Sequence, residues 1–385
     1  MTAPDAAKRH RASSAIALSY ITPHPTVATG LSSYTRSLVE ALAADPVRPQ
    51  IHFMTNVENE EIFAGLSRHA NVHWIQLPAR RGLPYKLYEP LIHFRACARA
   101  AFLRCASYIS CTAAASPLPL TRQYFVLHDL YDIEPKFRPF RTVLYSHLLW
   151  RILALVSRGI ICVSETTYRD AQPVMGFARR KMHIVLEASK FEPSPPTTPP
   201  VQFTFVANLQ ANKNVECLLE ALSEAEKAGQ RFIVRWVGRD DGRLADWTRQ
   251  RGIPEGFTSL GSVSDEQLKA LYRGSWALIV PSFKEGFCLP VLEAHSFGVP
   301  VVAADIPILR EVAGEGALFF DPNSPSSLLE RLSLLASSPD LRHELSLSSL
   351  NNVRRFSWGK SAKNLLDIIE RSAETLPMEV GGKSK

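Results

Sequence analysis

The stretch Trp276-Ala-Leu-Ile-Val-Pro-Ser-Phe-Lys-Glu-Gly-Phe-Cys-Leu-Pro-Val-Leu-Glu-Ala-His-Ser-Phe-Gly-Val-Pro300 decides the fold of this chain. It begins with an apolar run of the length of a buried strand in a parallel sheet. Pro281 ends that run, Gly286 frees the backbone of the following loop, and Pro290 suits the first turn of a helix. Gly298 ends the helix after about two turns. The stretch therefore predicts a strand, a loop and a short helix within an α/β fold.

The start of this short helix is suited to bind an anion. Backbone N–H groups at Cys288 and Leu289 are expected to face outward, and the helix dipole favours negative charge there. Two carboxylates flank this point, Glu285 in the loop and Glu293 in the helix. Carboxylates repel a phosphate but accept hydrogen bonds from sugar hydroxyls. The pattern therefore suits a ligand with a diphosphate in the middle and a sugar at each end, which is a sugar nucleotide.

The same stretch resembles glycosyltransferase family 4, whose retaining enzymes have the two-domain GT-B fold. Glu285 and Glu293 stand in the E-x7-E relation of that family, within P-S-x-x-E-G-F-x-L-P-x-L-E-A and before G-x-P-V-V. The resemblance implies that Glu293 holds the nucleotide ribose and that Glu285 lies near the hydroxyls of the transferred sugar. The residues between them that are expected to contact the donor are Gly286, Phe287, Cys288 and Leu289. The family more often has glycine at Cys288, where a positive φ would make any side chain costly.

Other positions in the second half of the chain match the family or depart from it. Lys213 matches a lysine that meets the donor diphosphate, a suitable role for a compact cation. Asn208 stands where many members carry arginine, so a neutral hydrogen bond replaces one charged phosphate contact. Arg239 is a candidate to supply that charge. Gly261 lies in a turn that resembles the one beside the nucleotide base.

Two positions in the first half carry the resemblance further. The segment from Tyr124 reads as a strand that ends in His128-Asp129, and ligands are expected at the carboxyl ends of parallel strands. The resemblance implies that His128 meets the transferred sugar or the acceptor. It also implies that Gly30, ahead of a predicted helix, lies along the cleft and helps to place donor phosphate and acceptor. The predicted fold is GT-B: two Rossmann-like domains with parallel sheets that face an interdomain cleft.

The proline-rich segment Pro193–Pro200, with five prolines in eight residues, predicts the domain boundary. The predicted division is a flexible tail 1–14, an N-terminal acceptor domain 15–192, a linker 193–200, a nucleotide-sugar domain 201–355, a helix 356–372 that crosses back to the first domain, and a disordered tail 373–385.

The composition is that of a globular protein large enough for two to three domains, with 385 residues, 46% of them hydrophobic. The net charge of +7 leaves open nucleic acid, an anionic membrane surface or phosphate-bearing substrates as partners, and equally a solvated surface with no partner. The resemblance favours phosphate-bearing substrates, and no nucleic-acid partner is expected. Six cysteines without a C-x-x-C pair fit a reducing cytoplasm.

Two segments, 78–105 and 136–158, interleave basic residues with aromatic and aliphatic ones. Such a segment can lie on an anionic bilayer, and it can equally form an ordinary surface helix with a core face. The first interpretation suggests a lipid-linked acceptor and an enzyme resting on the inner face of the plasma membrane. No apolar run is long enough for a transmembrane helix, so the expected location is the cytoplasm.

The resemblance implies a retaining hexosyltransferase of surface polysaccharide or glycolipid assembly. Its catalytic residues would be Glu285, His128 and Lys213, and no metal or other cofactor is expected because no Asp-x-Asp motif stands where a metal would hold the diphosphate. GDP-mannose is favoured over UDP-sugars as the donor, and a glycan or lipid-linked glycan is the expected acceptor. A sugar-nucleotide 2-epimerase and a non-catalytic binding protein remain alternatives. A Rossmann oxidoreductase is disfavoured because G-x-G-x-x-G is missing.

Overall fold

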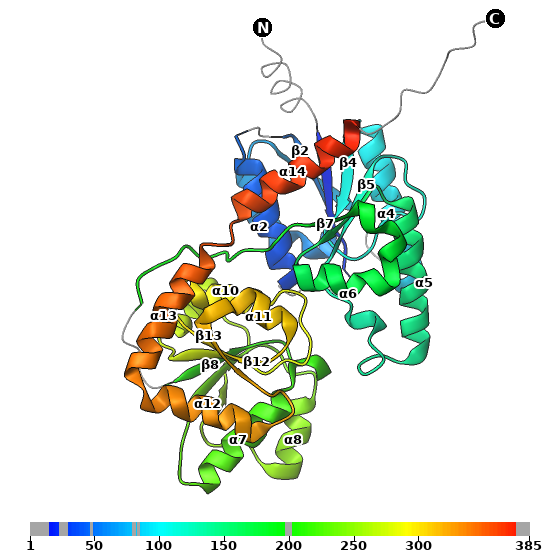
Figure 1. Cartoon of the computed structure of the whole chain (residues 1–385). Coiled ribbons are helices and arrows are strands. Elements are labelled where there is room, and N and C mark those ends of the chain that lie inside the picture. Colours follow the sequence, from blue (N-terminus) through cyan, green and yellow to red (C-terminus); the bar gives the residue numbers. More distant parts are fainter. Residues whose placement is uncertain are drawn as a thin grey trace, which may run out of the picture.

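The computed structural model describes residues 15–22, 30–46, 49–78, 82, 85–196 and 202–374. These residues form two α/β lobes, each built around a parallel sheet (Figure 1). The strands of the N-terminal lobe lie between Ile16 and Ile184, and those of the C-terminal lobe between Phe203 and Phe320. The predicted tail 1–14, linker residues 197–200 and the predicted tail from 375 onward lie outside the described residues.

The sheet of the N-terminal lobe reverses its strand order beside β1. In order across the sheet, its described strands are β3 (Val72–Leu77), β2 (Ile51–Asn56), β1 (Ile16–Tyr20), β4 (Ser107–Ser110), β5 (Gln123–Leu127), β6 (Gly159–Cys162) and β7 (Met182–Ile184). The central strands are buried along their whole length, as expected of parallel strands covered on both faces. All carboxyl ends share one edge of the sheet, and ligands are expected at that edge where the order reverses.

Helices cover both faces of this sheet. Phe125 of β5 packs in one cluster with Trp150, whereas Tyr124 belongs to the cluster on the opposite face together with Leu38. The helical elements of this lobe are α2 (Gly30–Ala44), η1 (Val57–Asn59), α3 (Glu60–Phe63), η2 (Ala64–Arg68), α4 (Tyr85–Phe102), η3 (Tyr131–Ile133), α5 (Phe140–Val156), α6 (Glu165–Met175) and η4 (Gly176–Lys181). Helices α4, α5 and α6 share the face of Phe125, and α2 lies on the other. In the described residues, no helix combines the length and apolar character that crossing a membrane needs.

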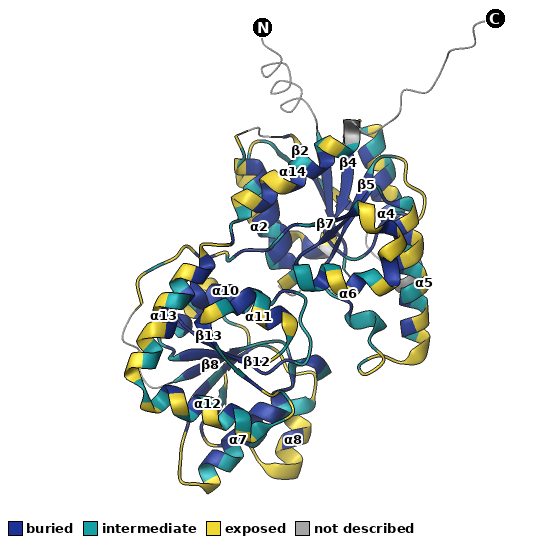
Figure 2. Cartoon of the chain, viewed as in Figure 1, coloured by how far each residue is buried: buried dark blue, intermediate teal, exposed yellow. Residues whose placement is uncertain are grey.

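The C-terminal lobe repeats this design with a shorter sheet. In order across it, the described strands are β10 (Phe257–Ser259), β9 (Val234–Val237), β8 (Phe203–Val206), β11 (Ala277–Val280), β12 (Val301–Ala304) and β13 (Ala317–Phe320). The helical elements are η5 (Ala211–Lys213), α7 (Val215–Lys227), α8 (Arg243–Arg251), α9 (Asp265–Arg273), α10 (Leu289–His295), α11 (Pro307–Ala313), η6 (Gly314–Gly316), α12 (Pro325–Ser337) and α13 (Pro339–Val353). The strand, loop and helix predicted over 276–300 are β11, the loop after it and α10. Figure 2 shows this sheet buried beneath its helices.

The last helix, α14 (Trp358–Glu374), returns to the N-terminal lobe and packs against α2 (Figure 1). The rings of Trp358 and Tyr34 meet edge to face with centroids 5.5 Å apart. At the other end, the Arg158 guanidinium donates to the backbone carbonyl of Ser372 at 2.7 Å. The helix ends two residues beyond its predicted limit at 372. Both lobes are therefore joined twice, by the segment after β7 and by α14.

Four strands escaped the sequence analysis. They are β4, β7, β10 and β13, each three or four residues long, and β11, which was predicted, is just as short. The turn expected at Gly261 follows β10, which ends at Ser259. Pairing with neighbouring strands creates these elements, so they depend on tertiary structure.

Candidate active site

Lys213 and Glu285 meet at the carboxyl edge of the C-terminal sheet. Lys213 follows β8, Glu285 follows β11, and these two strands are hydrogen-bonded neighbours. The Lys213 Nζ lies 2.7 and 2.8 Å from the two carboxylate oxygens of Glu285, and Ser282 Oγ donates to Oε1 at 2.6 Å. Burial acts to lower the pKa of Lys213, but Glu285, Cys288 and Asp129 together outweigh it, so this pKa stands above its usual value. The pair thus holds a cation and a carboxylate in one fixed place.

Two asparagines hold the loop that carries this pair. Asn214 adopts the left-handed conformation, and its side-chain amide donates to the carbonyls of Pro281 and Pro322 at 2.9 and 2.8 Å. The amide of Asn212 donates to the carbonyl of Lys284 at 2.9 Å. The loop before Glu285 is therefore fixed to the loop after β8, so Lys213 and Glu285 cannot move apart independently.

Gly286 brings the same loop against the N-terminal lobe. A Cβ at this position would lie 2.2 Å from the backbone oxygen of His128, so no side chain fits. The carbonyl of Gly286 accepts hydrogen bonds from Ser164 Oγ at 3.3 Å and Thr167 Oγ1 at 3.2 Å. Glycine is needed here for close contact between the lobes. The neighbouring Phe287 is buried, and its ring packs edge-on to Phe356, so only its backbone is available to a ligand.

Helix α10 begins beside this loop. Cys288 precedes it with φ +73° and ψ 63°, which is the left-handed conformation that glycine adopts without cost. The substitution noted in the sequence is therefore at a position that does require positive φ. Leu289 and Pro290 form the first turn, where the backbone N–H of Leu289 has no acceptor within the helix. An anion at this helix start would lie close to Lys213, since that cation interacts electrostatically with Cys288.

Glu293 lies inside α10 and is buried, with 6% of its surface exposed. The Tyr272 hydroxyl donates to its Oε2 at 3.0 Å, and Lys190 Nζ lies 3.7 Å from its Oε1. Burial raises the pKa of Glu293, and the charge of Lys190 partly offsets that rise. The carboxylate keeps one oxygen near Lys190, which also pairs with Asp265 at 2.6 Å. Glu293 is thus placed to accept hydroxyl hydrogen bonds close to the segment between the lobes.

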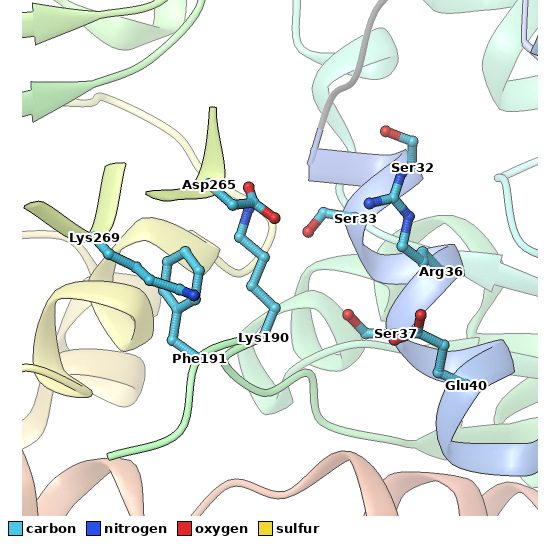
Figure 3. A pocket seen from close by; sticks show the side chains of 9 residues that line it. All are labelled: Ser32, Ser33, Arg36, Ser37, Glu40, Lys190, Phe191, Asp265 and Lys269. Atoms are coloured by element: carbon cyan, nitrogen blue, oxygen red, sulfur yellow. The ribbon is translucent and has the colours of Figure 1, made fainter. Parts of the chain in front are cut away.

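A pocket of about 260 Å³ adjoins Lys190 between α2 and α9. Its lining residues are Ser32, Ser33, Arg36, Ser37, Glu40, Lys190, Phe191, Asp265 and Lys269. Figure 3 shows the Lys190 side chain reaching Asp265, with Ser33 of α2 on the opposite wall. Gly30 opens α2 just before this wall, with open space around its Cα. The pocket therefore lies where the two lobes and their connection meet.

His128 follows β5 at the carboxyl edge of the N-terminal sheet. Its Nδ1 lies 3.1 Å from Glu187 Oε1, and its Nε2 lies 3.1 Å from the carbonyl oxygen of Cys111. The ring of Tyr34 packs on it edge to face at 4.6 Å. Both ring nitrogens thus have protein partners, and a ligand that used one of them would replace a hydrogen bond of this network. Burial raises the pKa of Glu187, while the hydrogen bond from His128 acts to lower it.

Asp129 links the two halves of the site. Its carboxylate accepts the backbone N–H of Tyr131 at 2.9 Å. Burial raises the pKa of Asp129, and the hydrogen bond from Tyr131 and the charges of His128 and Lys213 offset part of this rise. Lys213 of the C-terminal lobe therefore interacts with Asp129 across the cleft. Lys213 and Glu285 thus lie in the loops that face Asp129 and its neighbour His128, and the catalytic roles given to His128, Lys213 and Glu285 stay a prediction.

Further contacts close the lobes on each other. The Glu311 carboxylate accepts the backbone N–H groups of Glu165 and Thr166, both at 2.8 Å, at the start of α6. Lys284 pairs with Glu134 at 3.0 Å. Figure 1 shows α11, which carries Glu311, lying between the sheet of its own lobe and α6 of the other. These contacts hold the two lobes together in a closed arrangement.

Asn208, Arg239 and Gly261 form a separate group at the ends of β8, β9 and β10. Asn208 Oδ1 accepts the backbone N–H of Arg239 at 3.1 Å, and the N–H of Gly238 donates to the carbonyl of Gly261 at 3.0 Å. The side chain of Arg239 is exposed. Within the described ranges, no hydrogen bond or ion pair joins this group to Lys213 or Glu285. The role of Arg239 as a charged contact of the donor phosphate stays a prediction.

The sequence analysis missed four residues of this site: Glu187, Lys190, Tyr272 and Glu311. Glu187 and Lys190 lie in the segment after β7, which has no motif of its own. Tyr272 is a buried residue of α9, and an aromatic residue of this kind reads as part of the core. Glu311 lies on the short helix α11 and is partly buried. Only the charge of the two glutamates and of Lys190 was a signal, and such charges are common on surfaces.

Comparisons with known proteins match the C-terminal half most closely. The family described as Glycosyl transferases group 1 matches residues 187–349, which include Lys213, Glu285 and Glu293. The O-antigen chain mannosyltransferase B of Escherichia coli is 32% identical over 159 residues, 40% of this chain and 42% of that protein. The D-inositol 3-phosphate glycosyltransferase of Rhodococcus erythropolis is 30% identical over 181 residues, 44% of this chain and 41% of that protein. The chain thus spans about two fifths of the length of these curated relatives.

Similarity of the fold extends over nearly the whole chain. The structure of sucrose-phosphate synthase from Thermosynechococcus elongatus superposes with a TM-score of 0.73 and 16% identity, over 93% of this chain and 98% of that one. At this identity the likeness concerns the fold alone, and it confirms the predicted pair of parallel sheets. The chain therefore matches the Glycosyl transferases group 1 family over residues 187–349, and its two parallel sheets are arranged as in solved glycosyltransferase structures with the GT-B fold.

Proposed function

We propose that this protein transfers a hexose, with mannose as the first candidate, from a nucleotide diphosphosugar to an acceptor hydroxyl with retention at the anomeric carbon. The observation that carries the proposal is the Lys213–Glu285 pair beside the start of α10. A cation and backbone N–H groups suit the diphosphate, and the two carboxylates suit sugar hydroxyls. Mannose is favoured by the E-G-F-x-L-P sequence and by the similarity to an O-antigen mannosyltransferase.

In the proposed reaction, the bond between the anomeric carbon and the phosphate oxygen breaks while the acceptor oxygen bonds to the same carbon. The departing diphosphate gains negative charge, which Lys213 and the first N–H groups of α10 stabilise. The acceptor attacks on the side of the leaving group, and its proton passes to the departing phosphate oxygen. Retention follows because the acceptor oxygen bonds to the anomeric carbon on the same face from which the phosphate oxygen departs.

The remaining site residues have positioning roles in this proposal. Glu293 accepts hydrogen bonds from the nucleotide ribose, with Lys190 as its neighbour. Glu285 accepts hydrogen bonds from the hexose and holds the Lys213 cation in place. His128 lies at the acceptor side of the cleft, where its contact with Glu187 sets the orientation of its ring. A glycan or lipid-linked glycan is the proposed acceptor.

Two measurements test the function. A thermal-shift panel of GDP, UDP, ADP and their sugars identifies the donor, because a ligand at a hundred times its Kd adds about 2.7 kcal/mol to native-state stability. The products formed from GDP-mannose are then identified by mass spectrometry, with and without a glycolipid fraction from a Gram-negative membrane. This measurement distinguishes glycosyl transfer, 2-epimerisation and binding without conversion. A mannosylated acceptor supports transfer. Donor epimerised without an acceptor would identify a 2-epimerase, and a stabilising ligand that is never converted would identify a binding protein.

A further inference from the structure

The outer side of α5 carries a row of large apolar side chains from one end to the other. Its exposed large side chains are Phe140, Leu144, Leu148, Ile152 and Leu155, with exposed fractions from 41% to 77%. They recur every three or four residues and so lie on one side of the helix, which we call the α5 row. The opposite side is buried through Val143, Trp150 and Leu153. A helix that is apolar on both sides is normally covered on both, but Figure 2 shows α5 at the edge of its lobe with exposed outer positions.

Positive charge flanks the α5 row. Arg141 and Arg151 are exposed and lie on the same side of the helix, and α5 carries no carboxylate. The guanidinium of Arg151 lies 5.4 Å from the ring of Phe177, which is itself half-exposed. An apolar strip with cations on its flanks and without acidic residues matches a surface of acyl chains beneath anionic headgroups.

Helix α4 extends this surface. It packs on the same face of the sheet as α5, and its exposed positions include Leu91, Arg95, Arg99 and Phe102. The Arg99 guanidinium lies 5.4 Å from the Phe102 ring. Two neighbouring helices therefore present large apolar side chains interleaved with arginines on one face of the N-terminal lobe.

We propose that the α5 row docks this protein on the surface of an anionic phospholipid bilayer. A second copy of the chain is a poorer occupant, because a symmetric contact would set Arg141 and Arg151 against the same residues with no carboxylate on the helix to pair with them. The row also begins beside the cleft, since Lys136, just before α5, lies 3.8 Å from the ring of Phe283 in the other lobe. Docking would therefore bring the cleft next to the headgroups. This inference goes beyond the proposed transfer reaction and does not depend on it.

Flotation with vesicles tests the proposal. The probes are vesicles of phosphatidylcholine alone and of phosphatidylcholine with phosphatidylglycerol. The wild-type chain should float with the anionic vesicles, and the double variant Leu144→Gln/Leu148→Gln should bind them about tenfold more weakly or worse, because two inserted side chains are lost. Arg141→Gln and Arg151→Gln should each weaken binding about fivefold and reduce its salt dependence.

The matched control is Leu334→Gln/Leu347→Gln, which changes two exposed leucines of the C-terminal lobe and should float like the wild type. Donor-induced thermal shifts should be equal in all variants, so loss of docking is separable from loss of the donor site. The proposal is overturned if the wild type does not float, or if the α5 double variant floats as well as the control. It is also overturned if sedimentation shows a dimer that the α5 variant dissociates while neither protein binds vesicles.

Discussion

The Nζ of Lys213 lies 2.7 and 2.8 Å from the two carboxylate oxygens of Glu285. Hydrogen bonds from two asparagine side chains join the loops that carry these two residues. The Lys213 ammonium group is therefore already paired with a protein carboxylate at the point where a donor diphosphate is proposed to bind. A bound diphosphate must share this charge with Glu285. The proposed pairing makes Glu285 a positioning group for Lys213 as well as an acceptor for sugar hydroxyls.

Replacing Lys213 should damage catalysis more than folding. We expect Lys213→Ala to lower kcat about a hundredfold and to raise the donor KM, because the charge that develops on the leaving diphosphate loses its nearest cation. Steady-state kinetics with varied donor measure both parameters, and thermal unfolding checks the fold. Lys227→Ala, on the exposed end of α7, is the matched control. A change confined to acceptor KM would contradict the role of Lys213.

Glu187 should act through His128. We expect Glu187→Ala to lower kcat about tenfold or more with little change in donor KM, because the 3.1 Å contact that orients the imidazole is lost. Glu187→Gln keeps an oxygen acceptor and should recover part of the rate. Glu330→Gln, on an exposed position of α12, controls for loss of a surface charge. Equal rates for Glu187→Ala and the wild type would exclude this positioning role.

Gly286 should be intolerant of any side chain. Its Cβ would lie 2.2 Å from the His128 carbonyl oxygen, so Gly286→Ala has to push the lobes apart. We expect a loss of transfer activity and a larger radius of gyration in small-angle scattering. Gly176→Ala is the control, because a Cβ there meets nothing within 4 Å. Wild-type dimensions and activity in Gly286→Ala would show that the closed contact is dispensable.

Cys288 should carry a conformational cost. Its φ of +73° is unfavourable for any residue with a Cβ, and the cost is about 1–2 kcal/mol. Glycine at this position removes the conformational cost, but its greater conformational freedom in the unfolded chain offsets part of the gain. Cys288→Gly should therefore raise the free energy of unfolding by about 0.5–1 kcal/mol. Urea unfolding measures this. Cys288→Ala keeps the Cβ and should show no gain; a gain equal to that of glycine would mean that the thiol, and not the backbone, is the source.

Two buried histidines should make the fold sensitive to acid. Burial lowers the pKa of His93 and of His295 from 6.5 to about 3 in the folded chain. Between these values the unfolded chain binds more protons than the folded one, so stability falls as the pH drops from about 6.5 toward 3. Each histidine contributes up to about 1.4 kcal/mol per pH unit in that window. Urea unfolding at a series of pH values measures the slope, and His93→Gln should reduce it. A stability that stays level from pH 7 to 4 would contradict this assignment.

The local elements of the site could be read from the chain because their causes are local. The prolines and glycines around β11 and α10 restrict the backbone within a few residues, whatever the rest of the chain does. Ser164 caps α6 by accepting the N–H of Thr167 at 2.9 Å, and Ser264 caps α9. The two glutamates of the E-x7-E motif, Glu285 and Glu293, could likewise be recognised from the sequence.

The partners of those residues were decided only by tertiary structure. Glu187 reaches His128 across 59 positions, and Glu311 reaches α6 across more than a hundred. Such contacts depend on how two sheets and their covering helices pack. The sequence alone does not distinguish a charged residue that is exposed from one that is paired. Packing also put Phe287 into the core and turned the apolar row of α5 outward. The sequence by itself determined the two-domain α/β fold and its donor motif, because backbone restraints and short patterns act locally; the closed cleft and its ion pairs arise only when the lobes meet.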